Sequence, residues 1–209
     1  MRHFALLAGV AACVSAAGAS AQTKWDMPTA YPVGNFHSAN IQKFADAVKQ
    51  STNGKLQITV HAGASLFKAP EIKRAVQTGQ AQIGEVLMVL LANENALFEA
   101  DGVPFLATDY AQARKLADAQ RPFVEKALEA QGLKLLFAVP WPPQGLYANK
   151  EINSLKDMEG LNWRSYSAAT QRIGELIKAQ PVTVQAAELS QALATGKVNA
   201  MITSGVTGV

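Results

Sequence analysis

The chain has few of the residues on which metal and catalytic sites usually depend. Its 209 residues include one cysteine and three histidines, and charged residues make up only 17%. His37 and His61 lie far apart in the sequence, and neither has a second histidine or a cysteine at metal-ligand spacing. Phosphate-binding glycine loops and the G-x-S-x-G motif of serine hydrolases are also absent. The sequence therefore gives no positive case for catalysis, and we expect no metal or other cofactor.

Runs of like charge are missing as well. The formal net charge is only +3, and without a basic cluster the chain is not expected to bind nucleic acid. The acidic residues, which include Glu71, Glu85, Glu94 and Glu188, show no spacing that marks out a catalytic pair. Surface positions and helix starts account for most of them. Apolar residues, by contrast, make up 49% of the chain, which is enough for a core.

The first 21 residues predict export from the cytoplasm. A short polar head with Arg2 precedes apolar and small residues and an A-x-A sequence at positions 19–21, which is the pattern of a cleavable signal peptide. The apolar run is shorter than the ~20 residues that a membrane-spanning helix needs. The only cysteine, Cys13, lies inside this segment. A lipid anchor on Cys13 is the weaker alternative, because the A-x-A site is the cleaner signal.

The remaining residues alternate between strand and helix patterns. Apolar residues recur at helical spacing in 37–51 and 70–79, and a period of two in 55–61 predicts a strand. The further expected strands are 24–30, 81–86, 133–139, 146–152, 181–184 and 198–205. The further expected helices are 110–119, 122–131, one with Ile173, Leu176 and Ile177 on a single face, and a short one that ends at Gly196. Residues 87–91 fit either a buried strand or a buried helix.

A cluster of prolines after position 139 marks the expected domain boundary. Strands alternate with helices before it and again after it, which predicts an α/β fold with largely parallel sheets. We therefore expect lobe one at residues 22–139 and lobe two at 140–209. Two such lobes leave a cleft between them, which is a common place for a small ligand. Two roles are open for Trp141, as a wall of this cleft or as packing for the crossover.

Arg164 is the best single candidate for a binding residue. It lies in a short segment, 160–167, between Trp163 and Tyr166, and before a helical pattern. A guanidinium group presents a planar fork that matches a carboxylate with two hydrogen bonds. The two aromatic neighbours fit the core or a cleft wall better than a stacking platform for a ligand.

Several segments together resemble the DctP-type solute receptors of TRAP transporters. They are NGKLQITVHAGASL (53–66), EIKRAVQTGQAQIG (71–84), DMEGLNWRSYSAAT (157–170) and AELSQALATGKVNAMITSG (187–205). The likeness covers nearly the whole mature chain. It implies a two-lobe periplasmic binding protein with a ligand cleft between the lobes. Such a protein is no enzyme: it captures an organic acid and delivers it to the membrane permease.

The resemblance also assigns roles to particular residues. The GLNWR segment places the family's carboxylate-binding arginine at Arg164, and ALATGKVNAMITS places a polar ligand contact at Thr203, with Ser204 beside it. A second arginine of some members falls near Gln144, so that charge is absent here, and Tyr147 offers a hydroxyl nearby. The predicted ligand-binding residues are Arg164, Thr203, Ser204, Gln144, Tyr147, Trp163 and Tyr166. One cation suits a monocarboxylate or 2-oxo acid better than a sialic acid.

Family members usually run to about three hundred residues, so the resemblance implies a chain that is incomplete at its C-terminus. We expect a monomer with an organic acid and a TRAP permease as its partners. Two other functions remain open: a secreted α/β enzyme, and a ligand-sensing subunit that reports to a signalling partner.

Overall fold

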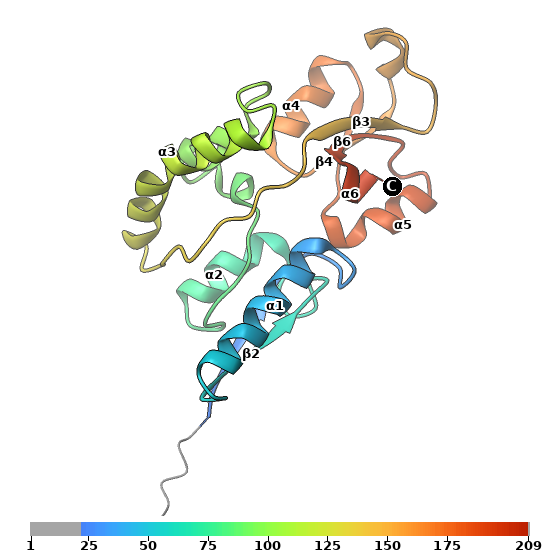
Figure 1. Cartoon of the computed structure of the whole chain (residues 1–209). Helices are drawn as coiled ribbons and strands as arrows, with labels where there is room; N and C mark the ends of the chain where they lie inside the picture. Colours follow the sequence, from blue (N-terminus) through green and yellow to red (C-terminus); the bar gives the residue numbers. More distant parts are fainter. Residues whose placement is uncertain (1–21, 209) are drawn as a thin grey trace, which may run out of the picture.

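The computed structural model describes residues 22–208. The predicted signal peptide, with Cys13, lies outside the described residues. The names lobe one and lobe two are kept below for the predicted ranges 22–139 and 140–209. Figure 1 shows residues 22–77, in blue to green, in the lower part of the molecule and residues 144–208, in orange to red, in the upper part. Both parts combine helices with a sheet, so the predicted α/β class is confirmed.

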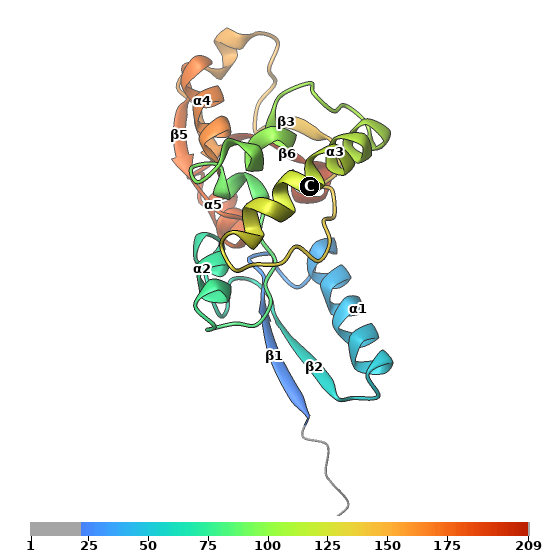
Figure 2. The same cartoon turned by 90° about the vertical axis from the view of Figure 1, so that its left-hand side faces the viewer.

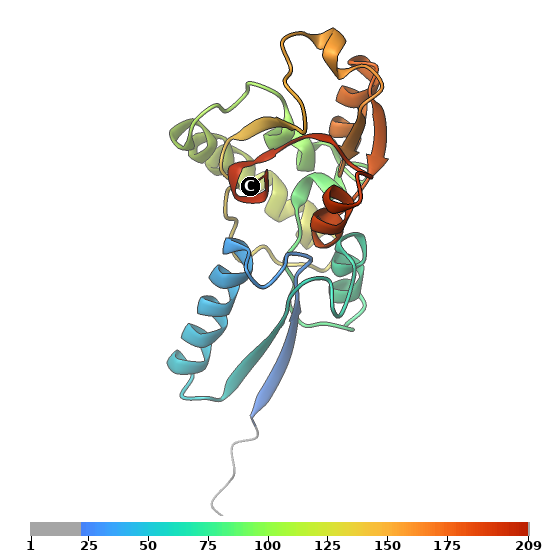
Figure 3. The same ribbon diagram turned by 90° about the vertical axis from the view of Figure 1, so that its right-hand side faces the viewer.

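Lobe one is built on a parallel pair of strands. Strand β1 (Thr23–Pro28) pairs with β2 (Leu56–His61), and α1 (Phe36–Ser51) makes the crossover. The pair runs side by side in Figure 2, and Figure 3 shows α1 along its flank. These three elements match the sequence prediction. The helix begins where the side chain of Asn35 accepts a hydrogen bond from the His37 amide at 2.9 Å, which satisfies one of the free N–H groups at a helix start.

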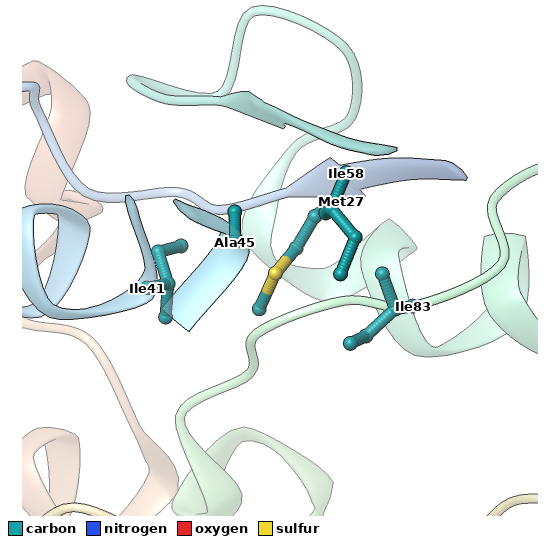
Figure 4. Packing of buried hydrophobic residues seen from close by; sticks show 5 residues of the cluster. All are labelled: Met27, Ile41, Ala45, Ile58 and Ile83. Atoms are coloured by element: carbon teal, nitrogen blue, oxygen red, sulfur yellow. The ribbon is translucent and has the colours of Figure 1, made fainter. Parts of the chain in front are cut away.

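The core of lobe one follows from the two periodicities. Ile41 and Ala45, four residues apart, lie on one face of α1, and Met27 and Ile58 point toward them from the strands (Figure 4). Ile83, from residues 81–86, completes this cluster. All five side chains are buried, and burying such apolar groups stabilises the fold by about 1.5–3 kcal/mol for each large side chain.

The third expected strand of lobe one, 81–86, is wrong as a strand. The segment follows the short helices η1 (Ala69–Glu71) and α2 (Ile72–Gln77) and leads into η2 (Met88–Leu91). Ala81 and Ile83 are buried in the alternating way of a strand. However, within the described residues the only backbone–backbone hydrogen bond between this segment and β1 runs from the Glu85 amide to the Pro28 carbonyl, at 3.1 Å. A ladder needs such bonds in succession, and apolar alternation alone does not supply them.

The two helices expected at 110–119 and 122–131 form one helix. After η3 (Ala96–Gly102), helix α3 runs without a break from Tyr110 to Glu129, with Pro122 inside it. Proline removes one backbone donor, which usually ends or kinks a helix. Here Pro122 and Asp118, the residue one turn before it, are both exposed, so water can hydrate the carbonyl group that loses its partner.

The strand expected at 133–139 is also wrong. The segment runs from the end of α3 toward lobe two and has no ladder partner among residues 22–208. Leu136, Phe137 and Val139 are 47%, 39% and 37% exposed. Phe137 still packs against Phe44 of α1, with ring centroids 5.2 Å apart. The apolar side chains that suggested a buried strand are instead only partly buried, and Phe137 packs against α1.

Lobe two contains a four-stranded sheet in the order β3-β6-β4-β5. Its strands are β3 (Gln144–Ala148), β4 (Asn162–Ser165), β5 (Gln180–Thr183) and β6 (Ala200–Ser204). Its helices are η4 (Leu155–Met158), α4 (Ala168–Leu176), η5 (Ala186–Glu188), α5 (Leu189–Ala194) and α6 (Gly205–Gly208). β4, β5 and β6 are parallel, whereas β3 is antiparallel to β6. The carboxyl ends of β4, β5 and β6 therefore lie at one edge of this sheet, where α/β folds commonly bind ligands.

The two faces of this sheet carry different helices. Trp163 and Ala200 pack on the side of α4, with Ile173 and Ile177 against them. Val184 and Met201 pack on the side of α5. Leu176 is 65% exposed, so it does not share the buried face expected for it. No helix in the described part of the chain is long and apolar enough to cross a membrane.

Candidate functional site

Arg164 lies near the carboxyl end of β4 and is 4% exposed. Its Nε donates a hydrogen bond to the Val184 carbonyl oxygen at 3.0 Å, just beyond β5. Its guanidinium carbon stands 4.8 Å from the centre of the Tyr166 ring, within the range of a cation–π contact. The neighbouring strand and the aromatic ring therefore fix the direction of this side chain.

The charge of Arg164 has no acidic counterpart in the described part of the chain. The ion pairs found there involve other residues. Burial lowers the pKa of Arg164, which the polar hydroxyls of Tyr166 and Tyr31 oppose. Even so, an arginine remains charged in proteins. A buried unpaired cation is costly, and an anionic ligand is the natural complement to it.

Strand alternation decides which predicted residues share a face with Arg164. Successive side chains on a strand point to opposite faces. The registers place Arg164, Thr203 and Tyr147 on the α5 side of the sheet. They place Ser204 and Gln144 on the α4 side, where the two residues are direct partners across β6 and β3. Thr203 and Ser204 are both buried, and α6 begins directly after Ser204.

Trp163 is the predicted site residue that the structure places elsewhere. It is 1% exposed in the core on the α4 side, and its Nε1 donates to the Thr170 carbonyl at 2.8 Å. Because it alternates with Arg164, the strand directs it away from the arginine side chain. The contacts seen for Trp163 are therefore packing contacts, and its role in ligand binding stays a prediction.

Tyr166 lies just after β4 and contacts residues from both faces of the sheet, Arg164 on the α5 side and Gln144 on the α4 side. Its ring lies under the Arg164 guanidinium, and its hydroxyl is 3.5 Å from the Gln144 Oε1. Gln144 is exposed, and its amide nitrogen donates to the Pro142 carbonyl at 3.2 Å. Tyr147 packs against the cluster that contains Val184. The structure thus brings Arg164, Tyr166 and Gln144 together.

Lobe one contributes aromatic residues that the sequence did not single out. Tyr31 and His37 are buried, and Trp141 of the crossover packs against both, with ring centroids 5.0 and 4.3 Å away. Phe36 lies 5.2 Å from the same indole ring. Of the two roles left open for Trp141, packing against lobe one is the role seen here. It fastens the crossover to the amino-terminal end of α1.

Tyr31 packs against His37 and Trp141, and charges from both lobes affect the pKa of its hydroxyl. Burial raises the pKa of Tyr31, the negative charge of Glu85 raises it further, and the charge of Arg164 lowers it. Both charged groups are therefore close enough to act on the same hydroxyl. We call the group formed by Tyr31, Glu85, Arg164 and Tyr166 the Arg164 site.

Glu85 is the acidic member of this site, and the sequence analysis did not single it out from the other acids, most of which it explained by surface positions or helix starts. Its side chain is 18% exposed. One carboxylate oxygen accepts a hydrogen bond from the hydroxyl of Thr29, which is fully buried. The other oxygen is 3.6 Å from His37 Nδ1. Burial raises the pKa of Glu85, and the Thr29 hydrogen bond opposes that shift. The available signal was a lone acid inside the apolar stretch 81–91.

The chain was compared with known protein families and solved structures. Residues 30–206 match the model of the DctP family, described as bacterial extracellular solute-binding protein, family 7. The chain belongs to this family. The resemblance inferred from the sequence is confirmed, and so is the two-lobe binding-protein fold, because solved members superpose on nearly the whole described chain.

Three solved family members are similar in both sequence and fold. DctP6 of Bordetella pertussis, an extracytoplasmic solute receptor binding pyroglutamic acid, is 56% identical with a TM-score of 0.86 over 89% of this chain. DctP7 of the same organism, which also binds pyroglutamic acid, is 46% identical with a TM-score of 0.86 over 89% of this chain. A marine metagenome TRAP solute-binding protein specific for pyroglutamate is 52% identical with a TM-score of 0.87 over 90% of this chain. The matched region spans 62% of the length of each of these three family members.

Proposed function

We propose that this chain is the ligand-capturing part of a periplasmic TRAP receptor and that it binds a small monocarboxylate through Arg164. The observation that carries the proposal is a buried guanidinium without an acidic partner in the described residues, at the strand ends of lobe two. A bidentate carboxylate would satisfy its fork with two charge-assisted hydrogen bonds. Thr203, on the same face of the sheet, is the proposed second polar contact.

The solved relatives narrow the ligand class. All three bind pyroglutamate, a cyclic monocarboxylate, and are 46–56% identical to this chain over the matched region. A monocarboxylate also agrees with the single cation of the site. We therefore take L-pyroglutamate as the first ligand to test. Export by the signal peptide would place the receptor in the periplasm, as a monomer that delivers the acid to its permease.

The direct test is calorimetric titration of the chain with L-pyroglutamate and a panel of other small carboxylates. The Arg164→Lys variant retains the positive charge but loses the planar fork, and we expect it to weaken binding by about tenfold to a hundredfold. Arg172→Lys is the matched control, because Arg172 is 67% exposed and pairs with Glu175 on the surface of α4. Its affinity should equal that of the unmodified chain.

Two outcomes would overturn the proposal. One is a folded chain that binds no carboxylate of the panel. The other is a carboxylate whose affinity is the same in the unmodified chain and in Arg164→Lys, because that ligand would be held without the guanidinium fork.

A further inference from the structure

The carboxylate of Glu85 has unused hydrogen-bonding capacity. The Oε2 atom accepts from Thr29, but the Oε1 atom has no hydrogen-bond donor within the described residues. The nearest ring nitrogen, His37 Nδ1, is 3.6 Å away, beyond hydrogen-bond distance. His37 is itself 4% exposed, and its Nε2 is buried without a partner in that same part of the chain.

No neighbouring cation neutralises Glu85. Burial lowers the pKa of His37 to about 4, so the imidazole is uncharged at neutral pH and cannot serve as the counter-ion. The guanidinium of Arg164 forms no ion pair with Glu85 in this structure. Tyr31 stacks on His37 with ring centroids 5.5 Å apart, beside Glu85, and the Arg164 charge also acts on the pKa of Tyr31. The site therefore has a cation, Arg164, in lobe two and an anion, Glu85, in lobe one. We call these two groups the poles of the site, and they form no ion pair with each other.

We propose that Glu85 is the specificity-determining residue of this site, accepting an N–H group from the ligand whose carboxylate binds Arg164. The inference rests on the proposed function and assigns Glu85 as the contact for the end of the ligand opposite its carboxylate. A lactam or amide carboxylate offers an anion to one pole and an N–H donor to the other. A ligand with a second carboxylate in that position would face the Glu85 charge and be rejected.

The expected discrimination is large because the group involved is charged and mostly buried. A site that hydrogen-bonds a ligand N–H discriminates strongly against an analogue that lacks it, since the acceptor is then left without a partner. For one charge-assisted hydrogen bond, the loss corresponds to about tenfold to a hundredfold in affinity. A dicarboxylate would place its second carboxylate against the Glu85 carboxylate. The repulsion between these two negative charges adds selection against dicarboxylates.

The test compares three probes in the same calorimetric assay. L-pyroglutamate has a ring N–H, its lactone analogue 5-oxotetrahydrofuran-2-carboxylate has a ring oxygen there, and glutarate is a dicarboxylate. We expect the unmodified chain to prefer the lactam over the lactone by about tenfold or more, and to bind glutarate most weakly. Glu85→Gln should lower the lactam-to-lactone ratio at least fivefold and narrow the gap to glutarate. Glu129→Gln, a change at an exposed acid of α3, should alter neither ratio.

A second variant separates charge from positioning and guards against misfolding of Glu85→Gln. Thr29→Val retains the Glu85 charge but removes the hydroxyl that holds one of its oxygens. It should reduce the preference for the lactam while leaving glutarate disfavoured. Circular dichroism and a thermal melt of each variant confirm that it is folded.

The outcomes distinguish this inference from the proposed function. Equal binding of lactam and lactone to the unmodified chain would overturn the role of Glu85 and leave the role of Arg164 standing. The same holds for a preference that is unchanged in both Glu85→Gln and Thr29→Val. Absence of binding by any carboxylate would overturn the proposed function, and the inference with it.

Discussion

Replacing Arg164 by methionine is expected to abolish acid binding at little cost to the stability of the ligand-free chain. Desolvation of the guanidinium costs several kcal/mol, and replacing buried ionic groups by apolar residues of similar volume is often stabilising by about 1–4 kcal/mol. Methionine suits this position, because it is long, flexible and apolar and so fills irregular space. Arg164 is 4% exposed, so solvent does little to screen its charge.

Two favourable contacts of Arg164 reduce the expected gain. The hydrogen bond from its Nε to the Val184 carbonyl, at 3.0 Å, is worth about 1.5–3 kcal/mol because the donor is charged. The contact with the Tyr166 ring, at 4.8 Å, adds about 0.5–2 kcal/mol. Together these losses amount to about 2–5 kcal/mol, close to the expected gain of about 1–4 kcal/mol, so the ligand-free Arg164→Met chain should lose less than about 2 kcal/mol of stability.

Thermal and denaturant unfolding with and without L-pyroglutamate measure both effects. Ligand at a hundred times its Kd should stabilise the unmodified chain by about 2.7 kcal/mol and leave Arg164→Met unchanged. Arg172→Met, on the exposed surface of α4, should stay within about 0.5 kcal/mol in either direction. If Arg164→Met destabilises the ligand-free chain by 2 kcal/mol or more, the reasoning about an unpaired buried charge is wrong.

Three further predictions follow from the described contacts. Burial lowers the pKa of His37 from 6.5 to about 4, so the unfolded chain binds a proton in this window that the folded chain does not. Stability should therefore fall by up to about 3 kcal/mol from pH 6.5 to pH 4, and denaturant titrations should show a shallower slope in His37→Gln; an equal slope would contradict this. Gly174→Ala would place a Cβ 2.6 Å from Trp163 Cδ1, and we expect a loss of about 1–3 kcal/mol in urea unfolding, against no loss in Gly34→Ala, whose Cβ meets nothing within 4 Å. Trp141→Ala removes the packing on Tyr31 and His37 and should cost about 3–5 kcal/mol; a Tm within a few degrees of the unmodified chain would show that the crossover is held by other contacts.

The elements that the sequence predicted well are those whose pattern is complete within one segment. Helix α1 shows its buried face through Ile41 and Ala45 and its start through Asn35. Strands β1 and β2 flank it at the length that a parallel crossover requires. Here the local pattern and the tertiary partner agree.

The failures concern features that depend on a distant partner. Residues 81–86 and 133–139 have strand-like composition, but a ladder also requires an aligned neighbour, which single-segment periodicity cannot supply. Pro122 suggested a break in α3, whereas its exposed position lets water replace the missing backbone bond. In both cases tertiary context overrode a local rule.

The site divides in the same way. Arg164 was predictable because a guanidinium suits a carboxylate and because the GLNWR segment resembles a family pattern. Tyr31 and His37 come from a turn and a helix start far away in sequence, and only folding brings them near β4. Glu85 was not singled out from the other acids because sequence alone does not report that Thr29 and His37 enclose it.

Arg164 and Glu85 carry opposite charges but form no ion pair with each other, and ligand binding offers a reason for this arrangement. A direct ion pair between Arg164 and Glu85 would satisfy both groups, but a ligand would then have to break that pair in order to bind. Because Arg164 and Glu85 form no ion pair with each other, a ligand of matching polarity can contact both groups without breaking one. Because the poles come from different lobes, a ligand that satisfies both favours any state in which the lobes are close together, by its difference in affinity between the open and closed states. Neutralising either pole by mutation should therefore weaken both selectivity and the coupling of ligand binding to lobe closure.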